Sequence, residues 1–318
     1  MSEPSPGLPD RIRDILAAES KRRSGQSWPQ LGPKLARAGF RLTQLTNGRG
    51  PELDRVRETR FGGVGCREYL PTSPRPGVIV FLHGGGFVLG DLDSHDATCR
   101  RITDQSGTRT IAVDYRLSPE HPYPAPLDDC EAATRAIVAA LGVPFSQTVL
   151  MGDSAGGCLA VATAARLLAT GVRLAGQCLL YPAFDSRCRT ESYHEFASGY
   201  GLTAETMHWF WSQYLGPIDR DAAPPDASPF ERESVAGLPP TYLLTCEYDV
   251  LRDEGEQFAA RLRASHIPTR AVRWPRVIHG FIQLAGLLPA GLEATEEAAD
   301  VAAAMIAGRF GELAESTA

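Results

Sequence analysis

Short apolar segments alternate with helical segments along most of this chain, and the alternation restricts the folds open to it. The most apolar segment, 78–82, has the pattern of a buried central strand. Further strand-like segments lie at 55–60, 66–70, 110–113, 148–151, 178–181, 241–246 and 270–274. Helical patterns lie between them, at 94–106, 126–141, 155–169 and 253–265. This rhythm is typical of an α/β fold in which helices cover both faces of a mostly parallel sheet.

Two segments fall outside this alternation. Residues 1–50 read as helical, and residues 184–238 form a long insertion that follows a strand. We expect the first to be an N-terminal helical cap segment and the second to be a cap insertion within a main domain of residues 51–318. Trp209 and Trp211 in the insertion are candidates for lining a substrate pocket, although aromatic side chains equally often fill a contact between a helix and the core.

The charge balance argues against two classes of partner. The 318 residues include 32 Lys and Arg against 38 Asp and Glu, which gives a formal net charge of −6, and no long basic run is present. We therefore expect neither nucleic acid nor an anionic membrane surface as a partner. Residues 1–10 lack the pattern of a signal peptide, and no segment approaches about eighteen consecutive apolar residues, so a cytoplasmic location is the simplest prediction.

The cysteines suggest neither a disulfide framework nor a zinc site. They are odd in number and widely spaced, and none lies beside a glycine-rich turn. We expect buried thiols rather than a catalytic cysteine, and no metal site. The seven positions are Cys66, Cys99, Cys130, Cys158, Cys178, Cys188 and Cys246.

A candidate nucleophile lies in the sequence Gly152-Asp-Ser-Ala-Gly156. It matches the G-x-S-x-G pattern and stands between a strand-like segment and an Ala-rich helical segment. Such a turn holds the serine in a strained backbone conformation, and it needs small neighbours because the strand and the helix pass close together. The pattern and its context therefore predict Ser154 as the nucleophile.

A second glycine-rich sequence, His83-Gly-Gly-Gly86, directly follows the strand-like segment 78–82. Glycines at such a position allow backbone N–H groups to point into a cavity, where they can stabilise the oxyanion of a tetrahedral intermediate. We predict the N–H groups of Gly84, Gly85 and Ala155 as the oxyanion hole. We expect His83 to orient this loop rather than to act as the catalytic base.

A serine nucleophile needs an acid and a base, and in this type of fold they follow it in the order acid, then histidine. His279 lies shortly after the last strand-like segment, where a loop can bring it over the sheet. Asp249 lies three residues beyond the segment that ends at Cys246. It is therefore the best placed carboxylate, with Glu247 as the alternative.

The other histidines and carboxylates of this half of the chain are expected to have different roles. His194 and His208 fall in the insertion, and His266 precedes the last strand at the wrong edge of the sheet. We expect Asp253 and Glu254 to serve the N-terminus of the helix that follows.

Five motifs in this order resemble the hormone-sensitive-lipase family of α/β-hydrolases, particularly its bacterial acetyl esterase and carboxylesterase branch. They are His83-Gly-Gly-Gly-Phe87, Asp114-Tyr-Arg-Leu-Ser-Pro-Glu120, Gly152-Asp-Ser-Ala-Gly-Gly157, Asp249-Val-Leu-Arg-Asp-Glu-Gly255 and His279-Gly-Phe281. The resemblance implies an α/β-hydrolase fold with a mostly parallel eight-stranded sheet. It also implies a cap built from the N-terminal helices and the insertion after the sixth strand, a preference for short acyl chains, and neither metal nor cofactor.

One position departs from that family. Trp274-Pro-Arg276 stands where the family often has an aromatic residue, proline and glycine, and we expect this difference to alter the loop that carries His279.

The function that follows is hydrolysis of a small-molecule ester by a carboxylesterase, through an acyl-enzyme on Ser154. The alternatives are amide or formamide hydrolysis by the same residues, a ligand receptor resembling the plant gibberellin receptor, and a long-chain lipase. The receptor lineage lacks the catalytic histidine, and the sequence shows no extended apolar surface for interfacial binding. The sequence is compatible with a homodimer.

Overall fold

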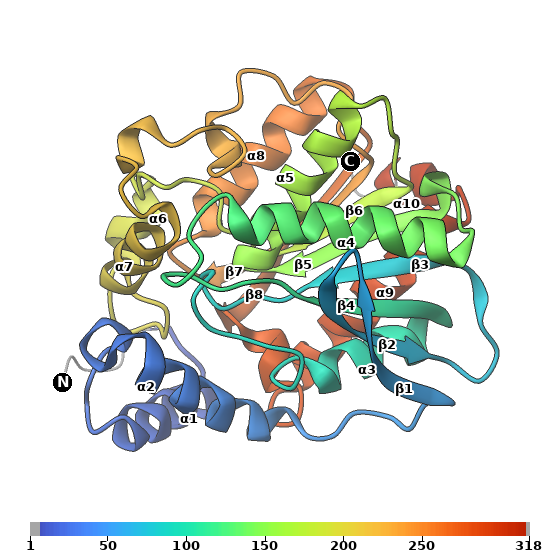
Figure 1. The fold of residues 1–318 in the computed structure, drawn as a ribbon. Coiled ribbons are helices and arrows are strands. Elements are labelled where there is room, and N and C mark those ends of the chain that lie inside the picture. The colour runs from blue at the N-terminus through green and yellow to red at the C-terminus, as the bar shows by residue number, and fades with distance from the viewer. Residues whose placement is uncertain (1–6, 316–318) are drawn as a thin grey trace.

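An eight-stranded sheet forms the centre of the computed structural model, which describes residues 7–315 (Figure 1). The strands lie in the order β1-β2-β4-β3-β5-β6-β7-β8; β2 pairs antiparallel with β1 and with β4, and all other pairs are parallel. The predicted mostly parallel eight-stranded sheet is therefore confirmed. The strands are β1 (Arg55–Phe61), β2 (Val64–Leu70), β3 (Arg75–Leu82), β4 (Thr108–Asp114), β5 (Thr148–Asp153), β6 (Gly176–Leu180), β7 (Thr241–Tyr248) and β8 (Thr269–Ile278).

Helices cover both faces of the sheet. On one face α3 (Asp96–Ser106) packs against α9 (Pro289–Ile306), and α10 (Phe310–Glu315) follows. On the other face lie α4 (Ala125–Leu141), α5 (Ala155–Ala169) and α8 (Arg252–Ala264). The central strand β3 lies between these layers, and Val78, Ile79, Val80, Phe81 and Leu82 are fully buried. This burial on both faces explains why the strand is apolar along its length instead of alternating.

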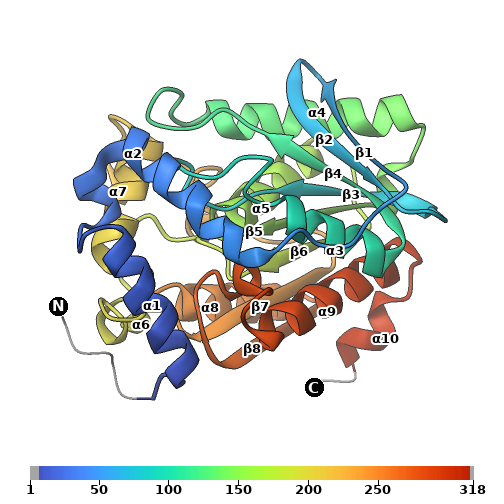
Figure 2. The ribbon, with the colours of Figure 1, turned by 90° about the horizontal axis from the view of Figure 1, so that it is seen from below.

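The two segments outside the alternation lie together beside the sheet. α1 (Asp10–Arg22) and α2 (Trp28–Thr43) lie next to α6 (Glu191–Glu195) and α7 (Ala204–Leu215), as Figure 2 shows from below. A break at Gly32, where φ is 68°, divides α2 in front of Pro33. The first six residues of the expected cap segment and the last three of the main domain lie outside the described part of the chain.

Arg37 fastens α2 to the main body of the protein. Its Nε donates to the Val88 carbonyl oxygen and its Nη2 to that of Ser118, each over 2.8 Å. The same guanidinium forms an ion pair with Glu120, 2.6 Å between Nη2 and Oε2. Helix α2 is therefore tied both to the loop that follows β3 and to the loop that follows β4.

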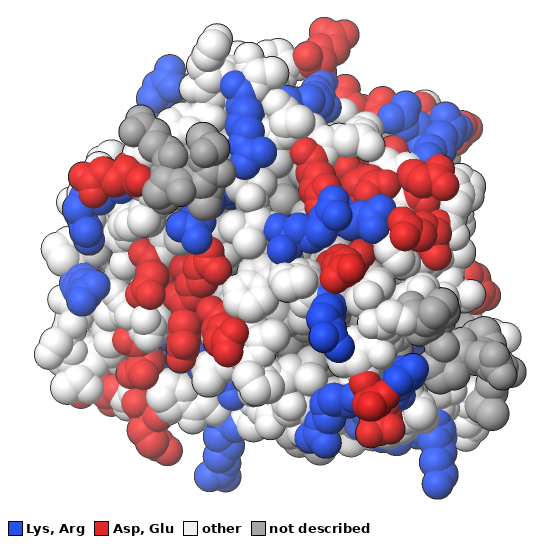
Figure 3. All heavy atoms as spheres, turned by 180° about the vertical axis from the view of Figure 1, so that it is seen from behind, with Lys and Arg blue, Asp and Glu red and all other residues white. Residues whose placement is uncertain are grey.

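The surface shows no large area of one charge on the face drawn in Figure 3, where acidic and basic side chains are interspersed. Of the helices in the described range 7–315, none has both the length and the apolar character that crossing a bilayer requires.

Candidate active site

Ser154 stands at the sharp turn between β5 and α5. Its φ of 54° and ψ of −120° are unusual for a residue with a side chain, and its N–H donates to the Leu180 carbonyl oxygen over 2.8 Å. A Cβ on Gly156 would lie 1.9 Å from the Leu82 carbonyl oxygen, and one on Gly152 would lie 2.3 Å from that of Gly156. Both glycines are therefore required by the close approach of the backbone segments that form this turn.

His279 connects Ser154 to Asp249. The Nε2 atom of His279 lies 2.9 Å from Ser154 Oγ, and its Nδ1 lies 2.7 Å from Asp249 Oδ2. Asp249 is 2% exposed and Ser154 is 7% exposed, so the chain of hydrogen bonds is shielded from bulk water. The second oxygen of Asp249, Oδ1, accepts from the Leu251 N–H over 3.0 Å. This bond fixes the carboxylate while leaving Oδ2 for the imidazole.

The other acidic residues near Asp249 have structural partners instead. Glu247 accepts from the N–H of Arg276 over 2.6 Å; the φ of 58° at Arg276 shows the local backbone distortion in β8. Asp253 and Glu254 lie in the first turn of α8, as expected, and both also bind the insertion. Asp253 Oδ2 accepts from the Ser192 N–H over 2.8 Å, and the buried Glu254 accepts from the Phe184 N–H over 2.5 Å. Both carboxylates therefore connect the first turn of α8 to the insertion.

The remaining histidines considered from the sequence lie away from this arrangement. His194 and His266 are exposed, and His208 contacts Arg220.

The glycine-rich loop after β3 requires one correction. The N–H of Gly84 donates to Asp153 Oδ1 over 2.8 Å, so this group is already bound and cannot point into the cavity as predicted. Gly85 and Gly86, with φ of 117° and 62°, line the cavity beside Ser154 and His279. The available N–H groups of this loop are therefore those of its second and third glycines.

Buried polar groups support the loop from behind. The ring of His83 stacks on Tyr115 with 4.2 Å between the centroids, and Tyr115 Oη donates to the His83 carbonyl oxygen over 2.6 Å. Burial, together with the neighbouring His95, lowers the pKa of His83 to about 4. Burial alone would raise the pKa of Asp153, but His95, 3.3 Å away, and the Gly84 N–H lower it below its ordinary value. Asp153 therefore stays ionised and His83 neutral.

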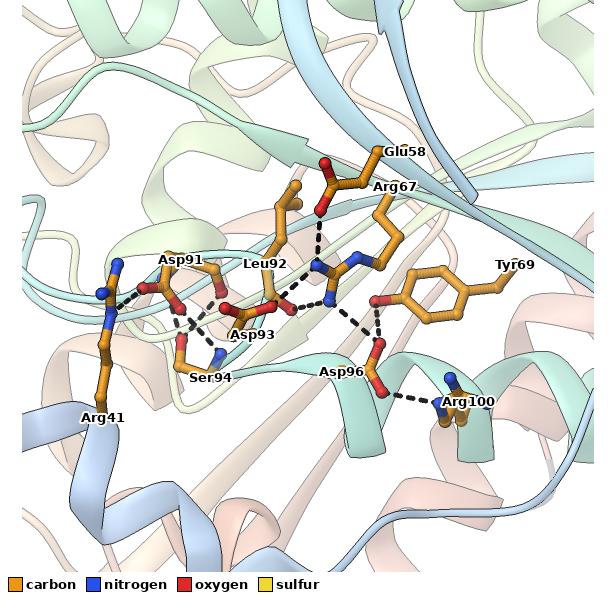
Figure 4. A network of polar contacts seen from close by, with 10 residues as sticks. All are labelled: Arg41, Glu58, Arg67, Tyr69, Asp91, Leu92, Asp93, Ser94, Asp96 and Arg100. Carbon is orange, nitrogen blue, oxygen red and sulfur yellow. Dashed lines mark hydrogen bonds and ion pairs between the residues drawn. The ribbon is translucent and has the colours of Figure 1, made fainter. Parts of the chain in front are cut away.

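A polar network holds the segment that carries His95 (Figure 4). Arg67 binds the Leu92 carbonyl oxygen over 3.2 Å and the carboxylates of Asp93 and Asp96 over 2.8 and 3.2 Å. In the same segment, Ser94 Oγ lies 2.9 Å from Nδ1 of His95 itself. The network therefore places His95 beside Asp153, the residue that precedes the nucleophile.

The cavity above Ser154 has a volume of about 150 Å³ and mostly apolar walls. Neither Trp209 nor Trp211 lines it; Trp211 is fully buried, with its ring 5.2 Å from that of Phe87. The residue between them, Phe210, does line it. The N-terminal helices, which were expected only as a cap segment, also contribute a wall, which consists of Ile15, Leu16, Glu19, Arg23, Trp28 and Phe40.

The described residues contain no group of three or more His, Cys, Asp or Glu side chains placed to bind a metal ion. All seven cysteines are free and buried. Burial raises the pKa of Cys66 and that of Cys188 to about 12, which makes their thiolates scarce at neutral pH.

Residues 79–283 match a protein-family model described as the alpha/beta hydrolase fold. Esterase LipI of Mycobacterium tuberculosis is 37% identical over 242 residues, which are 74% of this chain and 76% of LipI. The ethyl acetate hydrolase of Pseudomonas putida is 32% identical over 88% of this chain and 93% of its own. The solved structure of a hyperthermophilic esterase from Pyrobaculum calidifontis has a TM-score of 0.87 at 34% identity, covering 95% of this chain and 99% of that esterase.

Proposed function

This chain belongs to the α/β-hydrolase family, in its hormone-sensitive-lipase-like group, and is a carboxylic ester hydrolase; we propose that it cleaves short-chain acyl esters through Ser154, His279 and Asp249. The observation that carries the proposal is the continuous path of two hydrogen bonds, 2.9 and 2.7 Å long, from the Ser154 hydroxyl through His279 to a buried carboxylate. This is the arrangement that activates a serine hydroxyl for acyl transfer.

In the first half of the reaction, His279 Nε2 takes the proton of Ser154 as Oγ attacks the ester carbonyl carbon. The imidazolium then gives this proton to the leaving alcohol, and an acyl-enzyme remains. In the second half, the same nitrogen deprotonates a water molecule that attacks the acyl-enzyme, and the imidazolium then returns this proton to Ser154 Oγ as the acid is released. Asp249 keeps its charge throughout, because its role is to hold the ring and to stabilise the imidazolium.

The oxyanion of each tetrahedral intermediate is bound by backbone N–H groups. We assign this role to Gly85, Gly86 and Ala155, of which the first two line the cavity and the third follows the nucleophile at the first position of α5. Ala155 also lies at a helix N-terminus, where the helix dipole favours negative charge.

The preference for short acyl chains is supported by the size and the walls of the cavity. A volume of about 150 Å³ is close to that of an apolar cavity that binds benzene, so a short acyl group fills it and a fatty acyl chain does not. The apolar side chains of Leu89, Phe210 and Ile278 line it and would contact the acyl group.

The test is the hydrolysis of p-nitrophenyl esters from acetate to palmitate by the purified protein and by its Ser154→Ala variant. We expect activity that is highest for short chains and falls by at least about 10³-fold in the variant, while the circular dichroism spectrum and the melting temperature stay within the wild-type range. Ester hydrolysis at the wild-type rate by Ser154→Ala would contradict the mechanism. Turnover of anilides or formamides without turnover of esters would favour an amidase, and ligand binding without any turnover would favour a receptor.

A further inference from the structure

A second cavity, of about 610 Å³, adjoins the active-site cavity, and we call it the vestibule. Leu16, Arg23, Trp28 and Gly201 line both cavities. These four residues therefore lie between the two cavities, and we call the boundary that they form the neck. A substrate group that reaches beyond the neck would lie in the vestibule.

The walls of both cavities are mostly apolar. The lining of the vestibule also includes an amide and several hydroxyl groups, those of Gln26, Ser20, Ser27, Ser198, Thr203 and Thr206. The charged side chains among its described lining residues are Arg13 and Arg23, without a carboxylate. Arg13 is paired with Asp10. The vestibule is therefore suited to a polar group that accepts hydrogen bonds, and Arg23 is the cation that remains for it.

Arg23 is held at the neck in a fixed position. Its guanidinium carbon lies 4.6 Å from the centroid of the Trp28 ring, and its Nη1 donates to the Gln26 carbonyl oxygen over 2.9 Å. Its Nε is shielded from solvent and has no acceptor within residues 7–315. A guanidinium that is stacked on an aromatic ring loses little freedom when it binds a planar anion.

Glu19 is the carboxylate nearest to this position in the sequence, one helical turn before Arg23. It lines the inner cavity and not the vestibule, and its nearest cationic atom is Nη2 of Arg22, at 3.9 Å. Burial raises its pKa, while the charges of Arg22 and Arg23 act in the opposite direction. No carboxylate in the described part of the chain lies within ion-pair distance of Arg23, and Glu19 acts on it only over a longer distance. The guanidinium can therefore form a direct ion pair with a ligand.

We propose that the preferred esters carry a carboxylate on the part that passes the neck, and that Arg23 is the specificity-determining residue that binds it. This inference rests on the proposed function. Arg23 and Ser154 line the same small cavity, so a spacer of a few carbon atoms separates the scissile ester from the carboxylate. The guanidinium matches a carboxylate in charge and in planar, two-pronged geometry.

The test compares two pairs of esters of matched length by titration of the acid released at constant pH. In one pair the acyl side carries the charge, as monoethyl glutarate against ethyl hexanoate; in the other the alcohol side carries it, as 4-acetoxybutanoate against pentyl acetate. The readout is the selectivity, defined as kcat/KM of the charged ester divided by that of the neutral ester. We expect the selectivity to fall by about tenfold or more in Arg23→Gln for one of the pairs.

Arg22→Gln is the matched control, because it removes the neighbouring charge from outside both cavities, and it should keep the wild-type selectivity. Arg23→Lys keeps the charge and should lose less selectivity than Arg23→Gln. A disturbance of the N-terminal helices, by contrast, would lower the selectivity in both variants. High salt should reduce the selectivity of the wild type more than that of Arg23→Gln. Wild-type selectivity in Arg23→Gln for both pairs would overturn the inference alone. A wild-type protein that hydrolyses none of the four esters would overturn the proposed function as well.

Discussion

The ring of Phe210 occupies the space next to the α-carbon of Gly86. A Cβ on Gly86 would lie 2.2 Å from Cγ of this ring, far inside any permitted contact. Phe210 belongs to α7 in the insertion, and Gly86 belongs to the loop that supplies the proposed oxyanion donors. The insertion therefore packs directly on the loop that has to stay in place for catalysis.

Gly86→Ala should lower kcat by about 10²-fold, because the methyl group displaces either the ring or the N–H that binds the oxyanion. Gly63→Ala is the control: Gly63 has a φ of 83° but open space around its α-carbon, so it shares the backbone strain without the collision. That variant should lose about 1–2 kcal/mol of unfolding free energy and keep kcat within about twofold. Equal losses of kcat in both variants would show that strain, and not the contact with Phe210, is responsible.

Phe210→Ala should shift the preferred substrate to longer acyl chains, since removal of the ring enlarges the cavity. Each additional methylene group that becomes buried is worth about 0.8 kcal/mol, or roughly a fourfold gain in kcat/KM for the longer ester relative to the wild type. Trp209→Ala removes the neighbouring aromatic residue, which lies outside the cavity lining, and should leave the chain-length profile unchanged. The p-nitrophenyl ester series measures both chain-length profiles. A shift in Trp209→Ala without a shift in Phe210→Ala would show that Trp209, and not Phe210, limits the length of the acyl chain.

The fold and the positions of Ser154, His279 and Asp249 follow from local features of the sequence. Ser154 lies at a strand–turn–helix junction that the G-x-S-x-G pattern marks; Gly152 is required by a contact within this turn, and Gly156 by the approach of the neighbouring strand β3. The alternation of strands and helices then places the ends of β7 and β8 next to this turn, which brings Asp249 and His279 into reach.

Two predictions from the sequence were wrong: Gly84 as an oxyanion donor, and Trp209 or Trp211 as a residue of the pocket lining. Both depend on contacts between segments that are distant in the sequence. Three successive glycines cannot be distinguished locally, and Gly84 is excluded by Asp153, which lies 69 residues further along the chain. Similarly, Phe210 and its two tryptophan neighbours point in different directions around α7, and the packing of Trp211 against Phe87 decides which one faces the cavity. The wall contributed by α1 and α2 carries no motif at all.

Asp249→Asn should lower kcat by about 10⁴-fold, because an amide at this position favours the wrong tautomer of His279 and cannot stabilise the imidazolium. Glu247→Gln is the matched control, since Glu247 was the alternative acid but accepts from the Arg276 N–H instead. We expect it to lower kcat by less than about tenfold. Steady-state kinetics with a p-nitrophenyl ester distinguishes the two; a large loss in Glu247→Gln and a small one in Asp249→Asn would move the acid to Glu247.

The buried His83 should make the protein less stable as the pH falls from about 6.5 to about 4. In the unfolded chain this imidazole takes up a proton near its ordinary pKa of 6.5, whereas burial beside His95 keeps the pKa in the folded protein at about 4. Over this range the unfolded state binds more protons, so the free energy of unfolding should decrease by about 3 kcal/mol through this residue. The lowered pKa of Asp153 acts in a different range, because its stabilisation is lost only as the pH falls below about 3.8.

Urea unfolding between pH 4.5 and pH 7.5 measures this dependence, and His83→Gln should show a smaller decrease in unfolding free energy than the wild type. The decisive quantity is the slope of the unfolding free energy against pH. The absolute free energy is not decisive, because the substitution also changes the contact with Tyr115 and so lowers stability at every pH. His194→Gln removes an exposed histidine and should keep the wild-type slope. His83→Gln removes the titration of this one buried imidazole. If the variant kept the wild-type dependence on pH, groups other than His83 would cause the acid sensitivity.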